Sequence, residues 1–214
     1  MSALVFFLLA LNIAIATWNC YVVGVSRQVV RAQGGAFLRF VLWSAKFQAG
    51  IGFSMPLLIL FAFLATAWLT TGEEPKLTPE EAKQFMKAIF DLWYVAIIIP
   101  LLGTGLAITI HSVKAAFERR DFASVGSAVY NVGAQLHNTW GAIQHTGKAA
   151  SEVGEFVSET LSESRDGRIF ILFLLLAAVA FSFIGGFMIA TWLTNFFERN
   201  FSEAPIQTRR YRRA

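Results

Sequence analysis

The chain has 214 residues, of which 56% are hydrophobic and 15% are charged, and its formal net charge is +4. A soluble domain carries about 25% charged residues, so this composition excludes an ordinary soluble protein. The single cysteine, Cys20, excludes an intrachain disulfide and a multi-thiolate metal site. The sequence contains no zinc-protease, phosphate-loop, nucleophile-elbow or redox CxxC pattern. We therefore expect no enzyme, and no catalytic, cofactor-binding or metal-ligating residues.

Four strongly apolar stretches contain no Asp, Glu, Lys or Arg. They are residues 1–24, 47–72, 92–113 and 169–197. Each exceeds the roughly 20 residues that an α-helix needs to cross the core of a bilayer. We predict an all-α integral membrane protein with four transmembrane helices. The first is read as a span and not as a cleaved signal peptide, because it lacks a basic start and its apolar run continues through Val22 and Val23.

The connection between the first two stretches is strongly basic. Residues 25–48 contain four basic side chains and no acidic one: Arg27, Arg31, Arg39 and Lys46. The pair Gly34-Gly35 predicts a turn between two helices that both extend past the membrane surface. By the positive-inside rule this loop lies in the cytoplasm and the N-terminus lies outside. We expect the membrane to be a prokaryotic inner (plasma) membrane.

The next connection, residues 72–91, is acidic and belongs outside by the same rule. Within it, the run Thr78-Pro79-Glu80-Glu81 predicts the start of a helix. Thr78 is the expected N-cap, Pro79 the first helical residue, and Glu81 completes a capping box. This helix should continue directly into the third span.

A seven-residue rhythm marks residues 122–161, between the third and fourth spans. One heptad position is occupied by Gly126, Gly133, Trp140, Gly147 and Gly154. Apolar side chains recur at a second heptad position, which predicts a long amphipathic helix with a coiled-coil-like seam. Each glycine costs about 0.8–1.0 kcal/mol relative to alanine inside a helix. Four in register therefore predict a surface that another helix approaches closely.

Whether residues 122–147 cross the membrane is left with two answers. Polar side chains, among them Asn131, Gln135 and Asn138, disfavour insertion, and on that ground we favour four spans with a cytoplasmic helix. The alternative is five spans, which would satisfy the positive-inside rule everywhere and place the basic tail in the cytoplasm. The predicted organisation is a three-span region over 1–120 with helices reaching into the cytoplasm, the long helix over 121–165, the last span over 166–197 and a basic tail over 198–214.

The last span has a face of small residues spaced by four. They are Ala178, Ser182, Gly186 and Ala190. Such a face lets another helix approach closely, either within the chain or in a second subunit. In the first span, Asn12 and Asn19 share one side of the helix and are expected to form hydrogen bonds between helices.

These patterns predict a non-enzymatic structural or assembly subunit that packs through its small-residue helix faces. Membrane lipid is one expected partner, and the assembly would be a homo-oligomer or a larger membrane complex. The alternative is an oligomeric pore or channel lined by the uncharged polar residues of 122–147, namely Asn131, Gln135 and Asn138. The tail ends in four arginines that should contact anionic lipid or an acidic partner, and nucleic acid is not the expected ligand. They are Arg209, Arg210, Arg212 and Arg213.

Overall fold

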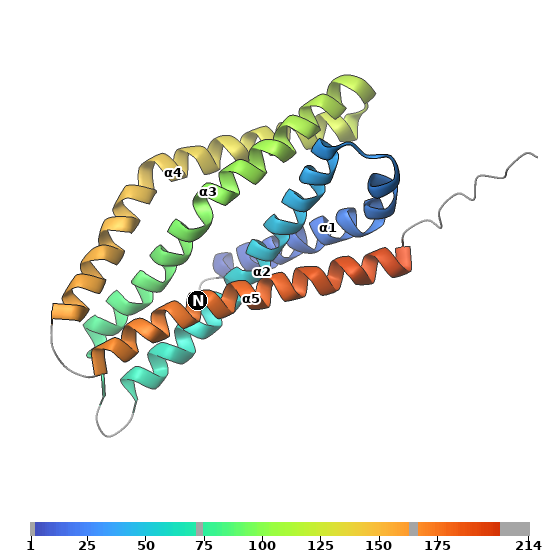
Figure 1. Cartoon of the computed structure of the whole chain (residues 1–214). Coiled ribbons are helices and arrows are strands. Elements are labelled where there is room, and N and C mark those ends of the chain that lie inside the picture. Colours follow the sequence, from blue (N-terminus) through green and yellow to red (C-terminus); the bar gives the residue numbers. More distant parts are fainter. Residues whose placement is uncertain (1–2, 72–74, 163–166, 202–214) are drawn as a thin grey trace, which may run out of the picture.

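The computed structural model describes residues 3–71, 75–162 and 167–201, and this part of the chain is entirely helical. Its five helices are α1 (Ala3–Gln33), α2 (Ala36–Thr70), α3 (Pro79–Arg119), α4 (Phe122–Ser162) and α5 (Gly167–Phe201) (Figure 1). Among the described residues, α1, α2, α3 and α5 are long and apolar enough to cross a membrane. The prediction of a helical membrane protein with four such helices is confirmed. Of the predicted basic tail (198–214), residues 198–201 continue α5, and residues 202–214 lie outside the described residues.

Local signals set three helix ends as predicted, namely the end of α1, the start of α2 and the start of α3. Thr78 caps α3 with both hydrogen bonds of a capping box: Glu81 N–H donates to Thr78 Oγ1 (3.3 Å), and Thr78 N–H donates to Glu81 Oε2 (2.7 Å). The helix then continues without interruption to Arg119. The Gly34-Gly35 turn is also confirmed, because α1 ends at Gln33 and α2 begins at Ala36.

A tight turn joins α3 to α4. Arg120 closes α3 in the left-handed region, with φ of 55°. Asp121 caps α4 by accepting a hydrogen bond at Oδ1 from Ser124 N–H (2.7 Å). This hydrogen bond is the main reason that the pKa of the Asp121 carboxyl lies below its ordinary value. From here α4 continues as one helix through all of its glycines.

Helix α2 lies at the centre of the molecule, against α1, α3 and α5. Its closest approach is to α5, where a Cβ added at Gly186 would lie 2.6 Å from Ser54 N. The larger of two hydrophobic clusters joins α2, α3 and α5 near the 72–78 connection. Its fully buried members include Leu58, Phe85 and Ile89.

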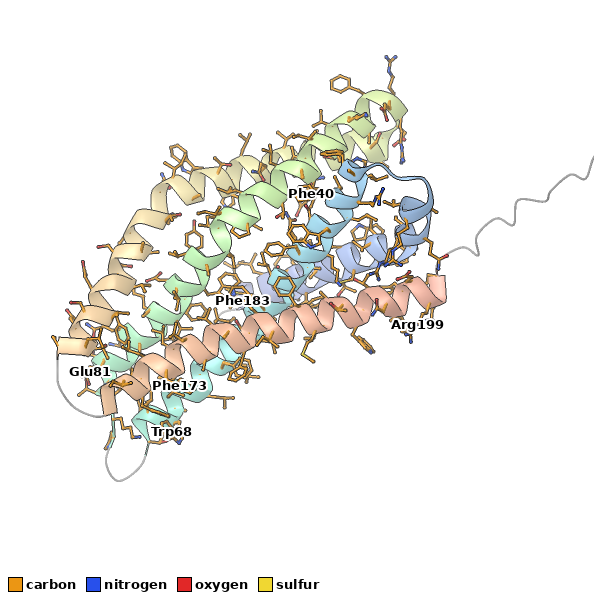
Figure 2. The ribbon with its side chains drawn as sticks, viewed as in Figure 1. Phe40, Trp68, Glu81, Phe173, Phe183 and Arg199 are labelled. Carbon is orange, nitrogen blue, oxygen red and sulfur yellow. The ribbon has the colours of Figure 1, made fainter. Side chains whose placement is uncertain are left out.

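The helix directions follow from contacts at the two ends. Trp68 at the end of α2 packs on Phe170 at the start of α5 (ring centroids 5.2 Å apart), whereas Arg27 near the end of α1 pairs with Glu198 near the end of α5 (2.8 Å). Figure 2 shows Trp68, Glu81 and Phe173 gathered at one end of the molecule and Arg199 at the other. Therefore α5 begins at the end where α2 finishes and α3 starts.

Helix α4 runs antiparallel beside α3 along its length (Figure 1). Thr109 Oγ1 donates to the carbonyl of Asn131 (3.2 Å), and Gln135 Nε2 donates to the carbonyl of Leu102 (3.1 Å). Near the far end, Phe85 and Phe156 are in ring contact (centroids 6.3 Å apart). Helix α4 thus returns the chain to the end of the molecule from which α3 started.

Candidate functional site

The face of α4 that contacts α3 is not the glycine stripe. It repeats every seven residues through Ala128, Gln135, Ala149 and Phe156, with the two alanines buried. The stripe of Gly126, Gly133, Trp140, Gly147 and Gly154 precedes this seam by two positions. Two residues correspond to about 200° around an α-helix, so the stripe lies on the opposite side of α4 from α3.

The stripe faces open space within the described part of the chain. A Cβ added at four of its glycines would meet nothing within 4 Å; these are Gly126, Gly133, Gly147 and Gly154. Trp140, the fifth member, is 61% exposed. Beside them, Leu136 and Ile143 are 67% and 73% exposed. We call this surface, from Gly126 to Gly154, the outer face of α4.

Exposed polar side chains share one heptad position on the outer face: Tyr130, His137, Gln144 and Ser151. Neither His137 nor Gln144 forms a hydrogen bond with any other described residue. Sequence reasoning passed over this pair in favour of Asn131, Gln135 and Asn138, because the face that α3 covers was unknown.

The three predicted lining residues lie mostly along α3. Gln135 donates to Leu102 as described, and the Asn131 carbonyl accepts from Thr109. Asn131 Nδ2 donates to Ser127 Oγ (3.3 Å), and Asn138 is half-buried. The side chain of Gln135 therefore lies in the seam between α3 and α4, whereas that of Asn131 lines the space between α4 and α1.

The predicted small face of α5 is used within the chain. Ala178, Ser182 and Ala190 are buried, and Gly186 meets the backbone of α2. Of the two possibilities that the sequence leaves open for this face, packing within the chain is the one observed. Asn12 also acts as predicted, since its Nδ2 donates to the carbonyl of Gly52 in α2 (2.8 Å).

A charged cluster that sequence reasoning missed joins α3 to α4 at the 72–78 end. Lys87 forms ion pairs with Asp91 (3.4 Å between Nζ and Oδ2) and with Glu152, and Lys148 pairs with Glu152 (3.9 Å). The hydrogen bond from Lys87 is the main cause that lowers the pKa of the Glu152 carboxyl. The signal was hard to find because Lys87 and Glu152 are far apart in the sequence.

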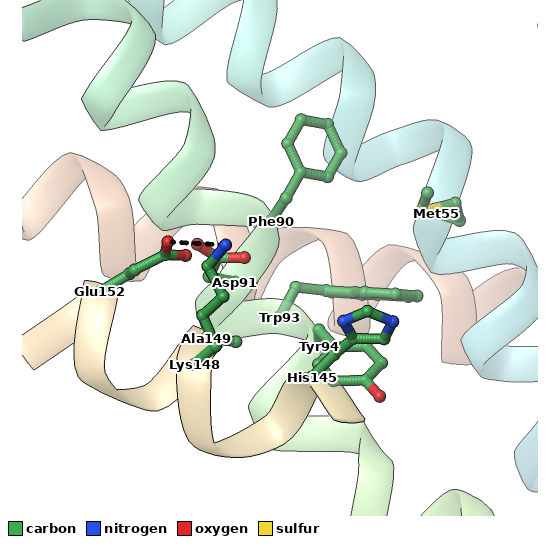
Figure 3. A pocket seen from close by; sticks show the side chains of 9 residues that line it. All are labelled: Met55, Phe90, Asp91, Trp93, Tyr94, His145, Lys148, Ala149 and Glu152. Carbon is green, nitrogen blue, oxygen red and sulfur yellow. Dashed lines mark ion pairs between the residues drawn. The ribbon is translucent and has the colours of Figure 1, made fainter. Parts of the chain in front are cut away.

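Beside this cluster is a cavity of about 450 Å³ between α2, α3 and α4 (Figure 3). Its aromatic wall includes Trp93 and Tyr94, with His145 of α4 next to them (Figure 3). Trp93 is fixed by the hydrogen bond that its Nε1 donates to Ser54 Oγ (3.0 Å). The carboxylates that border the cavity are already paired with lysines, so the cluster serves to clamp α4 to α3.

The four arginines of the tail lie outside the described residues. Comparison of the chain with protein-family models, with curated proteins and with solved structures gave no match.

Proposed function

We propose that this protein is a non-enzymatic structural subunit of a membrane assembly, and that it joins its neighbour through the outer face of α4. The observation that carries the proposal is the exposure of His137 and Gln144 beside the open glycine stripe. Exposed polar side chains call for a protein neighbour where α4 lies at the depth of the bilayer core, so the position of α4 in the membrane comes first.

The contacts with α3 support a fifth crossing by α4. Leu102 is at the middle of the uncharged stretch 92–113, and Gln135, which donates to it, is at the middle of the uncharged stretch 122–147. The charged residues at the end of one stretch also face those of the other, as Lys87 faces Glu152. If α3 crosses the bilayer, α4 then lies at the same depth.

The direction of α5 supports the same topology. Because α5 starts where α2 ends, a chain that crosses in α2, α3 and α5 needs a further crossing between α3 and α5. The side chain of Gln135 donates to α3 and that of Asn131 donates to Ser127, which reduces the cost of placing them in lipid. Five crossings also put residues 25–48 and the arginine tail on the cytoplasmic side, as the positive-inside rule requires. This arrangement favours the five-span alternative over a cytoplasmic helix.

At that depth, the outer face calls for a protein neighbour. Lipid tails offer no hydrogen-bond partner to His137 or Gln144, whereas a second helix does. Glycines let two helix backbones come close enough for such contacts. Leu136 and Ile143 alone would suit lipid equally well, so the polar pair and the glycines together make the distinction.

The experiment is to replace Gly133 and Gly147 by leucine and to measure particle mass in a mild detergent. We expect the assembly to dissociate, because the new side chains fill the groove into which the neighbour packs. Gly103→Leu is the matched control, since Gly103 is an exposed glycine in α3 that also has open space around it. An unchanged mass for the double variant would refute the proposal.

A pore is the second candidate, and the same polar pair favours it. A ring of copies with the outer faces of α4 turned inward would line its axis with His137 and Gln144, in place of Asn131 and Gln135. Planar-bilayer conductance separates the two functions. A scaffold leaves the conductance unchanged, whereas a pore raises it and His137→Leu lowers it again.

A further inference from the structure

A long groove separates α1 from the hairpin of α3 and α4. Within the described residues α1 touches α2 and α5 but neither α3 nor α4. The space between them measures about 1360 Å³, and α2 forms its floor. It follows α1 from Leu11 to Val30, a length of about 28 Å along a helix. This compares with the roughly 30 Å thickness of a bilayer core.

The groove has an apolar side and a polar side. Apolar side chains predominate along α1 and α2, among them Ile15, Val22 and Val41, with Asn19 and Ser26 as the polar exceptions. The lining from α3 and α4 is largely polar, and its charged residues are Arg119 and Asp121 at the turn between these helices. The groove therefore has the amphipathic order of a membrane lipid, with an apolar side along α1 and α2 and a charged mouth at the end of the membrane-spanning stretch.

We propose that one glycerophospholipid occupies this groove, with its acyl chains along α1 and α2 and its phosphate at Arg119. Protein interiors are packed as densely as organic crystals, so a groove of this size does not stay empty. Inside a bilayer, the molecules available to fill its apolar side are the hydrocarbon chains of lipids. The mouth offers one cation and one carboxylate, which match the phosphate and the ammonium of a zwitterionic headgroup. Arginine is also well suited to phosphate because its planar donors bind two oxygens together.

A helix from a second copy fits this groove less well. The open glycines that favour close helix contact stand on the outer face of α4, which is turned away from α3, and no glycine lines the groove. The proposed lipid site does not rest on the proposed assembly, and the two can fail separately.

The test is mass spectrometry of the intact, delipidated full chain in detergent with added phosphatidylethanolamine. We expect one lipid to bind per chain. Arg119→Gln should weaken this binding about fivefold, the value of one cationic contact with an anionic lipid group. Arg120→Gln is the matched control, since Arg120 is adjacent but does not line the groove. It should bind as the wild type does.

Two further measurements distinguish the contribution of the phosphate headgroup from that of the acyl chains. Diacylglycerol with the same acyl chains should bind more weakly than the phospholipid, and inorganic phosphate should not displace the phospholipid. Ala14→Trp should fill the groove and abolish binding, whereas Ala180→Trp on the exposed side of α5 should not. The proposal is overturned if Arg119→Gln and Arg120→Gln bind equally, if phosphate alone competes, or if Ala14→Trp disrupts a dimer instead.

Discussion

Two helices of this protein carry regularly spaced small residues, and the structure treats them in opposite ways. The small face of α5, centred on Gly186, is pressed against the backbone of α2. The glycine stripe of α4, centred on Gly133, looks onto open space. Small residues at helical spacing therefore predict the close approach of another helix, but which helix approaches depends on the surfaces that the other helices present.

The difference has a physical origin in the complementary surfaces. Helix α2 offers Gly50 and Ser54, spaced by four, directly opposite Gly186. Helix α4 meets α3 through its other side, with Ala128 and Ala149 buried in the seam. The chain therefore covers the α5 face internally and leaves the α4 stripe with open space around it among the described residues.

The largest expected effect is a difference in stability between a leucine substitution in the small face of α5 and one in the glycine stripe of α4. Gly186→Leu would drive a side chain into the backbone of α2, because even a Cβ there would lie 2.6 Å from Ser54 N. We expect the free energy of unfolding to fall by about 3 kcal/mol or more, the upper range for overpacking. Gly133→Leu should leave the isolated chain as stable as the wild type. Thermal unfolding in detergent measures both.

Equal unfolding temperatures for the two leucine variants would contradict the difference between the packed face of α5 and the open stripe of α4. Equal loss would mean that the stripe of α4 is packed within the chain after all. Equal tolerance would mean that α2 and α5 can separate at Gly186 without cost.

A smaller effect is expected at Trp140, the large member of the stripe. If the outer face is a contact surface, Trp140→Ala should weaken association by about 2 kcal/mol, as is typical for a buried interface tryptophan. Energy transfer between labelled chains in detergent reports the association. Trp192→Ala is the control, because Trp192 is similarly exposed but lies on α5. A larger loss for Trp192 than for Trp140 would move the contact surface to α5.

The helices themselves could be read from the sequence because their signals are local. Each of these signals depends on residues that are close in the sequence. They are the capping box at Thr78, the turn at Gly34-Gly35 and the seven-residue repeat that begins at residue 122. The length and charge of the apolar stretches likewise decide which helices suit a membrane. The capping box, the turn, one continuous helix over Phe122–Ser162 and four helices apolar enough to span a membrane appear in the structure as predicted.

The neighbours of each helix could not be read in the same way. The seven-residue rhythm in α4 fits two opposite faces, and only the position of α3 shows that Gln135 points inward while His137 points outward. The pairing of Lys87 with Glu152 likewise depends on the register between two helices. Such long-range choices are made by the packing of the whole chain, for which one sequence gives no direct signal.

Loss of a polar contact inside the chain should lower the free energy of unfolding less than Gly186→Leu does. Asn12→Leu removes the hydrogen bond to the Gly52 carbonyl, and such bonds between membrane helices contribute about 0.6 kcal/mol on average and at most about 1.7. Asn19→Leu should cost less, since Asn19 lines the groove and donates no hydrogen bond to another described residue. Unfolding in detergent compares them. A greater loss at Asn19 would indicate a polar partner in the groove.

The smallest effect concerns the clamp between α3 and α4 and depends on pH. The pKa of Glu152 is lowered from its ordinary value, mainly by the hydrogen bond from Lys87. A carboxyl whose pKa is lower in the folded state stabilises the fold above its unfolded pKa of about 4.3, and that contribution is lost as the pH falls through the folded value.

Glu152→Gln should therefore lower stability near neutral pH and flatten the acid limb of the unfolding curve. Glu155→Gln is the control, because Glu155 has no ion pair among the described residues. An acid limb unchanged by Glu152→Gln would show that the clamp does not hold α4 to α3. Association through the outer face should be unchanged by Glu152→Gln at neutral pH, because Glu152 lies on the side of α4 that faces Lys87 and not on the glycine stripe. Loss of the Glu152 charge would then loosen the inner contact of α4 and leave its outer contact intact, so the two faces of this one helix can be tested separately.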